Sequence, residues 1–209
     1  MQVSAELRWF WTHGVPPALG DWFRGLGDGA APGGGAPRLD EYVLDRTQRQ
    51  LGIKTRGGKS GVEVKGLVQI SAEEAVAPFA RRPQIWCKWT SDVLTIGHLQ
   101  RTTVRKVRLL RKFDADSELL REIALDEHER PRDAAVILPT HGCHIELVSL
   151  GIEGSTTTWW TLAFEAFGPM DTVEETLHRT LAHVLRESTP QLGDAQSLSY
   201  PEWLAREAL

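Results

Sequence analysis

The sequence has little cysteine and no long apolar run, and each shortage removes a class of protein. Its two cysteines, Cys87 and Cys143, lie far apart and form no Cys-x-x-Cys pair, which argues against a disulfide scaffold and favours a reducing compartment. No stretch approaches the roughly 18 apolar residues of a membrane helix, and Glu6 and Arg8 interrupt the start, where a signal peptide needs an apolar run. We therefore expect a cytoplasmic protein without a membrane partner.

An excess of positive charge is also missing. The formal net charge is −4 over 209 residues, which argues against a surface devoted to nucleic acid, so we expect no duplex partner and only local basic sites. The length suits one substantial core, and no repeat of fixed period is present, so residues 1–209 are expected to form a single domain. The Gly/Pro-rich segment 25–37 is expected to be a flexible loop within it. The oligomeric state is not indicated.

Common catalytic signatures are missing as well. There is no Gly-x-Ser-x-Gly, and the Gly-Gly-Lys-Ser-Gly at 57–61 lacks the preceding P-loop glycine, because Ile53 stands there. This stretch therefore indicates a hairpin turn. His141, Cys143 and His144 have no second ligand cluster at zinc spacing, which favours loop and core roles for them.

The remaining sequence predicts an α+β protein that is mainly antiparallel β. Strand-like runs with turn signals between them cover 3–11, 41–44, 51–56, 61–70, 83–89, 102–113, 143–150 and 156–168. Apolar residues at helical spacing predict a helix over 171–187, and a Ser71–Glu74 capping box predicts a short helix within 71–80. Residues 117–127 fit either a helix or a strand.

Several of these strands alternate charged and aliphatic residues. Same-face pairs are formed by Glu6 and Arg8, Lys54 and Arg56, Glu63 and Lys65, Trp86 and Lys88, and Lys106 and Arg108. The simplest interpretation is a sheet with its aliphatic face on the core and its charged face in water. A solvated face usually mixes signs and includes uncharged polar residues, whereas the central strands here repeat lysine and arginine.

The order of these segments resembles the CYTH superfamily, the triphosphate tunnel metalloenzymes. Residues 51–66 (LGIKTRGGKSGVEVKG) look like that family's arginine strand, turn and lysine strand, and residues 104–113 (VRKVRLLRKF) are similar to its Lys-x-Arg strand. Residues 162–168 (LAFEAFG) are similar to its late glutamate strand, and residues 198–204 (LSYPEWL) to its closing Ser-Tyr helix.

The resemblance implies a closed eight-stranded tunnel barrel with a few flanking helices and charged side chains inside. It implies a small phosphate-containing ligand, and the basic residues that we expect to bind it are Arg8, Lys54, Arg56, Lys65, Lys88, Lys106 and Arg108. It also implies Mg²⁺ or Mn²⁺ on the opposite wall, held by Glu6, Glu146 and Glu165. No catalytic residue is singled out, and Trp86 is a candidate ligand contact.

The first strand departs from the family's Glu-x-Glu-x-Lys, because Glu6 is followed by Arg8 and Phe10. An arginine in place of a glutamate removes a metal ligand and adds a positive charge beside the site, and Ala163 stands where a second late glutamate is common. Two functions stay open: a metal-dependent triphosphatase-like hydrolase, or a catalytically silent phosphate or nucleotide-binding module. In the second case Arg8 takes the place of the cation.

Overall fold

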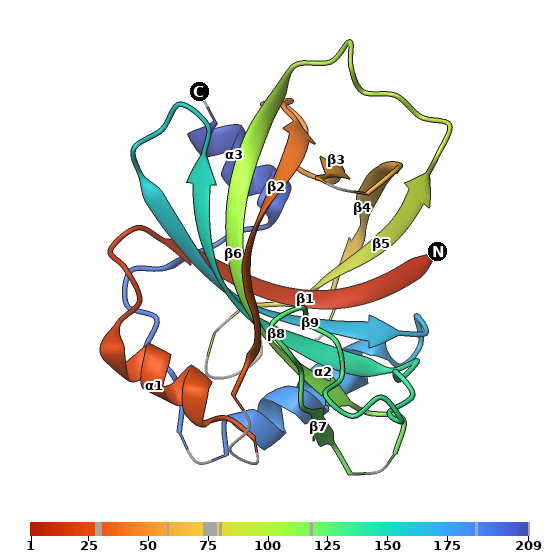
Figure 1. Cartoon of the computed structure of the whole chain (residues 1–209), viewed down its shortest axis with the longest axis vertical. Coiled ribbons are helices and arrows are strands. Elements are labelled where there is room, and N and C mark those ends of the chain that lie inside the picture. The colour runs from red at the N-terminus through yellow and green to blue at the C-terminus, as the bar shows by residue number, and fades with distance from the viewer. Residues whose placement is uncertain are drawn as a thin grey trace.

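The part of the chain that the structure describes forms a closed barrel of antiparallel strands with three helices. The computed structural model describes residues 1–27, 31–57, 59–72, 79, 81–117, 119–186 and 188–208. Eight strands pair in a ring, which β9 closes by pairing with β1 (Figure 1). In pairing order they are β1 (Gln2–Trp11), β5 (Gln84–Ser91), β4 (Val62–Ile70), β3 (Leu51–Arg56), β2 (Gly33–Val43), β6 (Arg101–Asp114), β8 (Gly142–Ile152) and β9 (Thr158–Gly168). The predicted fold class is confirmed.

Smaller elements attach to this ring. Strand β7 (Arg121–Ile123) pairs antiparallel with the end of β6, and β10 (Gln196–Ser197) pairs with the end of β1. The helices are α1 (Pro17–Gly25), α2 (Val173–Val184) and α3 (Tyr200–Glu207). Among the described residues, no helix has both the length and the apolar character needed to cross a membrane.

The largest apolar core lies outside the barrel, between the strands and the first two helices. Leu7 and Trp9 of β1 point outward with Phe164 of β9, and they pack with residues of α1 and α2 such as Phe23 and Leu177. Helix α2 therefore covers the outer face of β1, β8 and β9. All residues of β1 after Gln2 are buried, so Glu6 and Arg8 on its inner face do not lie in bulk solvent.

The side chains that fill the barrel change from polar to apolar along its axis. The inner face of β8 has His144 and Glu146 near its start, followed by the buried apolar residues Val148, Leu150 and Ile152. The apolar part is filled by α3, which the capping box of Ser199 and Glu202 begins. Its Trp203 stacks on Phe10 with ring centroids 5.2 Å apart. Helix α3 therefore closes one end of the interior and leaves a polar compartment beyond it.

The helices and the loop predicted from the sequence differ in how well they agree with the structure. The helix over 171–187 is confirmed as α2, and residues 117–127 contain the short strand β7 rather than a helix. The short helix predicted within 71–80 lies mostly outside the described residues. The loop predicted over 25–37 is wrong for its last part, since β2 begins at Gly33. Gly34, with a φ of 93°, accommodates an irregularity in the pairing of β2 with β6 before Pro37. The glycines and prolines of this segment therefore bend the strand and do not end it.

Candidate functional site

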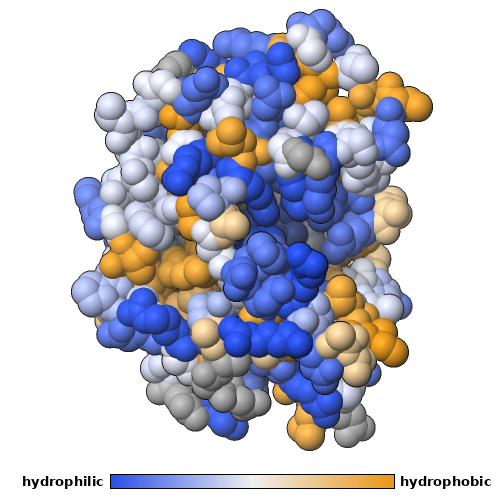
Figure 2. Space-filling model, viewed as in Figure 1, coloured by the Kyte–Doolittle hydropathy of each residue, from blue (hydrophilic) through white to orange (hydrophobic). Residues whose placement is uncertain are grey.

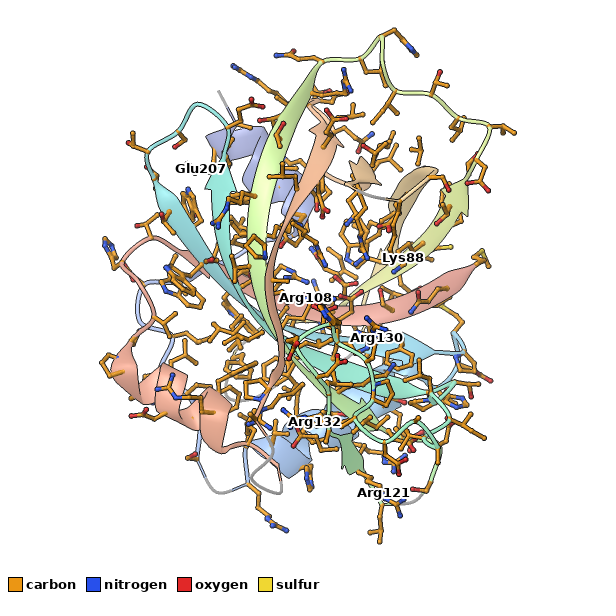
Figure 3. The ribbon with its side chains drawn as sticks, viewed as in Figure 1. Lys88, Arg108, Arg121, Arg130, Arg132 and Glu207 are labelled. Carbon is orange, nitrogen blue, oxygen red and sulfur yellow. The ribbon has the colours of Figure 1, made fainter. Side chains whose placement is uncertain are left out.

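The polar compartment of the barrel is a cavity of about 260 Å³. Every residue predicted from the sequence to bind phosphate or metal lines it, namely Glu6, Arg8, Lys54, Arg56, Lys65, Lys88, Lys106, Arg108, Glu146 and Glu165. Trp86 lines it as well. Hydrophilic residues border a hollowed region right of the centre in Figure 2, and Figure 3 shows Lys88 and Arg108 on different sides of the space within the barrel. Their convergence is confirmed, while their binding roles stay predictions.

One side of the cavity carries more cations than carboxylates. We call this side the cationic wall; it consists of Arg38, Lys54, Arg56, Lys88 and Lys106, from β2, β3, β5 and β6. Asp40 lies behind the wall, with carboxylate oxygens 3.2 Å from Lys54 Nζ and 3.3 Å from Lys106 Nζ. Glu63 contacts Lys54 and Arg56 at 3.2 and 3.4 Å. Lys88 takes part in no ion pair found among the described residues.

Burial and crowding shift the pKa values on this wall. Burial raises the pKa of Asp40, but Lys106 and Lys54 outweigh it and hold that pKa at about 2. Burial and the charge of Lys54 lower the pKa of Lys106 well below its usual range. Lys106 Nζ donates to Tyr42 Oη at 2.6 Å and lies 4.0 Å from the centroid of the Tyr200 ring. The wall therefore repels its own charges and favours an added anion.

The other side is a carboxylate network, in which Glu6, Glu146 and Glu165 meet the cations Arg8, Lys65 and Arg108. Arg8 Nη2 lies 3.3 Å from Glu146 and 3.7 Å from Glu165. Lys65 pairs with Glu6 and lies 3.4 Å from Glu165, and Arg108 pairs with Glu146. Each of the three carboxylates thus has at least one cationic partner in the protein, and Arg108 has a further carboxylate partner in Glu129.

The pKa values of the network follow from these contacts. Burial raises the pKa of Glu146, but Arg108 and Arg8 hold it well below its usual range. Burial raises the pKa of Glu165, but the charge of Lys65 outweighs burial and lowers this pKa to about 2. Burial and the neighbouring charge of Glu165 raise the pKa of Glu6. Ionised Glu146 and Glu165 therefore hold the Arg8 guanidinium firmly between them.

This arrangement does not fit a divalent metal. A Mg²⁺ or Mn²⁺ ion needs several oxygen ligands converging on one point, but a guanidinium nitrogen of Arg8 lies between Glu146 and Glu165. Among the described residues, no group of three His, Cys, Asp or Glu side chains is placed to hold a metal ion. The three glutamates come together as expected, but with protein cations as their partners.

Buried hydrogen-bond donors in the cavity lack acceptors. Within the described part of the chain, Arg8 Nη1 and Arg56 Nε are buried and have no hydrogen-bond partner. Arg38 Nε is also buried and makes no hydrogen bond, but it lies 3.5 Å from Asp40 Oδ1 in an ion pair. An unsatisfied donor of this kind is costly, more so on a charged group. Two arginines of the cavity, Arg8 on β1 and Arg56 on β3, therefore have N–H groups that an acceptor-rich ligand could satisfy.

The sequence also holds site residues that its first interpretation missed. Arg38, Tyr42, His144 and Tyr200 line the cavity. Arg38, Asp40 and Tyr42 alternate as a strand does, but the glycines and prolines before them masked this signal. Burial, only partly offset by Glu165, lowers the pKa of His144 to about 4, so this ring is neutral near pH 7.

Neither a protein-family model nor a curated protein sequence matches this chain. The chemistry of the cavity is accordingly interpreted from its own residues.

Proposed function

We propose that the barrel cavity binds a triphosphate or another compact organic phosphate, and that it does so without a divalent metal. The observation that carries the proposal is the set of buried arginine N–H groups without acceptors in a cavity lined by eight cations and four carboxylates. A phosphate supplies several charged acceptor oxygens, which guanidinium groups bind in pairs and lysines attract as point charges. An anion in the cavity would also relieve the repulsion within the cationic wall.

The size of the cavity supports a small ligand. Its volume of about 260 Å³ lies just below the roughly 300–1,000 Å³ of pockets that bury drug-sized molecules. A chain of three phosphates has a high charge for its volume, as this cavity requires. Trp86, on the same strand face as Lys88, would offer a flat apolar contact to an organic group attached to the chain.

Arg8 explains why the ligand would need no metal. In metal-dependent phosphate sites, carboxylates hold a cation that neutralises phosphate oxygens. Here Arg8 already neutralises Glu146 and Glu165 and still has a buried, unpartnered Nη1. The protein's own guanidinium would then face the ligand.

The alternative is a metal-dependent triphosphatase-like hydrolase. It requires Glu6, Glu146 and Glu165 to exchange their protein cations for Mg²⁺ or Mn²⁺. Mg²⁺-dependent release of phosphate from tripolyphosphate by the unmodified protein, abolished in Glu165→Gln, would establish the hydrolase and refute the metal-free binding module.

The test is ligand-induced thermal stabilisation by tripolyphosphate, measured with Mg²⁺ and with chelator. A ligand that binds the native state at 100 times its Kd stabilises by about 2.7 kcal/mol, so we expect a rise in Tm of several degrees, equal under both conditions. Arg56→Ala should remove most of it. Arg105→Ala is the matched control, since Arg105 is exposed and absent from the cavity lining; equal shifts in both variants would place the anion elsewhere.

A further inference from the structure

A hairpin outside the barrel ring brings an acidic side chain to the cavity. Residues 125–131 fold back on themselves through a bridge between Leu125 and Pro131 and a hydrogen bond from Asp126 N to Arg130 O of 2.8 Å. Asp126 Oδ1 accepts from the backbone N–H groups of His128 and Arg130, each at 2.8 Å. The backbone N–H of Glu129 also donates to Asp126 O at 3.0 Å, whereas the Glu129 side chain makes none of these bonds within the hairpin.

Glu129 has an unusual backbone and a specific partner. Its φ of 63° lies in the left-handed region, where it is the one non-glycine residue among those described, and such a conformation is unfavourable for a glutamate. This backbone directs its carboxylate to Arg108: Nε donates to Oε1 at 2.7 Å, and Nη2 pairs with Oε2. In Figure 3, Arg130, the neighbour of Glu129, is drawn close to Arg108.

The surroundings leave room for this pair. A Cβ on Gly34 would lie 2.4 Å from the carbonyl oxygen of Arg108 and 3.3 Å from Glu129 Oε1. Glycine at 34, which also has a positive φ, therefore allows β2 to pass closely under the pair. The glycine-rich start of β2 thus has a local role beside the cavity.

The pair occupies the part of Arg108 that would otherwise bind a ligand. Two parallel N–H···O contacts to a carboxylate have the same geometry as an arginine fork on a phosphate. The remaining nitrogen, Nη1, pairs with Glu146. All three guanidinium nitrogens of Arg108 are therefore engaged by carboxylates, whereas Arg8 Nη1 and Arg56 Nε have no hydrogen-bond partner.

We propose that Glu129 is a tethered competitor for the phosphate ligand, and that the hairpin 125–131 is a gate which opens when a ligand phosphate takes over the Arg108 fork. This inference rests on the proposed function and adds its regulation. Glu129 is suited to release, because its side chain is 25% exposed and its departure would relieve the left-handed backbone. A ligand must displace the carboxylate, so the closed gate lowers its apparent affinity.

A binding experiment separates the gate from an ordinary ion pair. The probe is tripolyphosphate, titrated calorimetrically into the full chain and three variants: Glu129→Gln, Glu129→Asp and Glu127→Gln. Removal of the competitor in Glu129→Gln should tighten binding about 10-fold. Glu129→Asp keeps the charge but shortens the arm, so it should tighten binding as well. Glu127 is on the same hairpin with its side chain 81% exposed, and its variant should bind like the parent.

The outcomes also distinguish this inference from the proposed function. If the parent binds and Glu129→Gln binds no more tightly, the gate is overturned and the binding function stands. A gain in Glu129→Gln but not in Glu129→Asp would assign the effect to charge alone and would also overturn the gate. If neither the parent nor Glu129→Gln binds, both proposals fail. Binding by Glu129→Gln alone would support both.

A second measurement reports the opening itself. Hydrogen exchange of the backbone amides of 126–130 should become faster when the parent is saturated with tripolyphosphate, because the hairpin loses its contact with Arg108. In Glu129→Gln the same amides should exchange fast already and should not respond to the ligand. Slower exchange in the parent on ligand addition would show that the hairpin closes over the ligand, which contradicts a competitor.

Discussion

Arg8 is the residue whose replacement tests the charge balance of the cavity most directly. Its guanidinium is buried and contacts Glu146 at 3.3 Å and Glu165 at 3.7 Å, and its carbon lies 4.7 Å from the centroid of the Tyr200 ring. The change Arg8→Gln removes the charge and keeps much of the length. After this change, the ionised and buried Glu146 keeps only Arg108 as a cationic partner, and Glu165 keeps only Lys65.

The expected loss follows from those contacts. Removal of one partner from a buried ion pair destabilises a protein by about 3–5 kcal/mol. Because both carboxylates keep another cation, we expect the lower end, about 3 kcal/mol. For a chain of 209 residues this corresponds to a Tm lower by about 6–12 °C. Arg105→Gln, on the exposed face, should change the Tm by much less.

Divalent metal provides the second part of the test. In Arg8→Gln the position between Glu146 and Glu165 no longer holds a cation, so Mg²⁺ or Mn²⁺ should restore part of the lost Tm in differential scanning calorimetry. The parent should not respond. A loss below 1 kcal/mol, or equal metal-induced stabilisation of parent and variant, would refute the conclusion that Arg8 serves as the resident cation.

Two further predictions concern stability. Phe10→Ala removes a buried ring that stacks on Trp203, so urea denaturation should show a loss of about 3–5 kcal/mol; a loss below 1 kcal/mol would mean that α3 is held mainly by other contacts. For His144, burial lowers the folded-state pKa to about 4. Between pH 6.5 and 4 the unfolded chain binds a proton at this residue that the folded chain does not, so His144 should lower the stability by about 2.4 kcal/mol as the pH drops from 7 to 4.5. His144→Gln should lose this part of the pH dependence, whereas His13→Gln, with an exposed ring, should retain it.

Strand positions were predictable because alternation is a local property. Each of the eight strand-like runs overlaps one strand of the barrel, and the charged sides of 51–56 and 104–113 face one interior. Alternation alone did not say whether that side faces water or a closed cavity; only the resemblance in the order of segments implied closure. The deciding physical fact is that helices cover the opposite side of β1, β8 and β9.

Contacts that depend on loop geometry could not be predicted. Glu129 reaches Arg108 from 21 positions away through a left-handed backbone that no periodicity indicates. The position of Arg8 between Glu146 and Glu165 was easier to predict from the sequence, because all three residues lie on inner faces of paired strands. Their separation along the barrel axis, however, depends on strand register, which the sequence pattern does not specify.

The pairing of β4 with β5 places two positive charges side by side in the wall of the cavity. Lys65 and Lys88 are direct cross-strand partners, and like charges in this position destabilise a sheet. The carboxylate network engages Lys65 through Glu6 and Glu165, so the uncompensated charge of this pair remains on Lys88, which belongs to the cationic wall. A polyanion in the cavity would neutralise Lys88 and the wall together. At equal free ligand concentration, the folded protein should therefore gain more stability from a triphosphate than from a single phosphate, since only the longer anion reaches several of these cations at once and binds with the lower Kd.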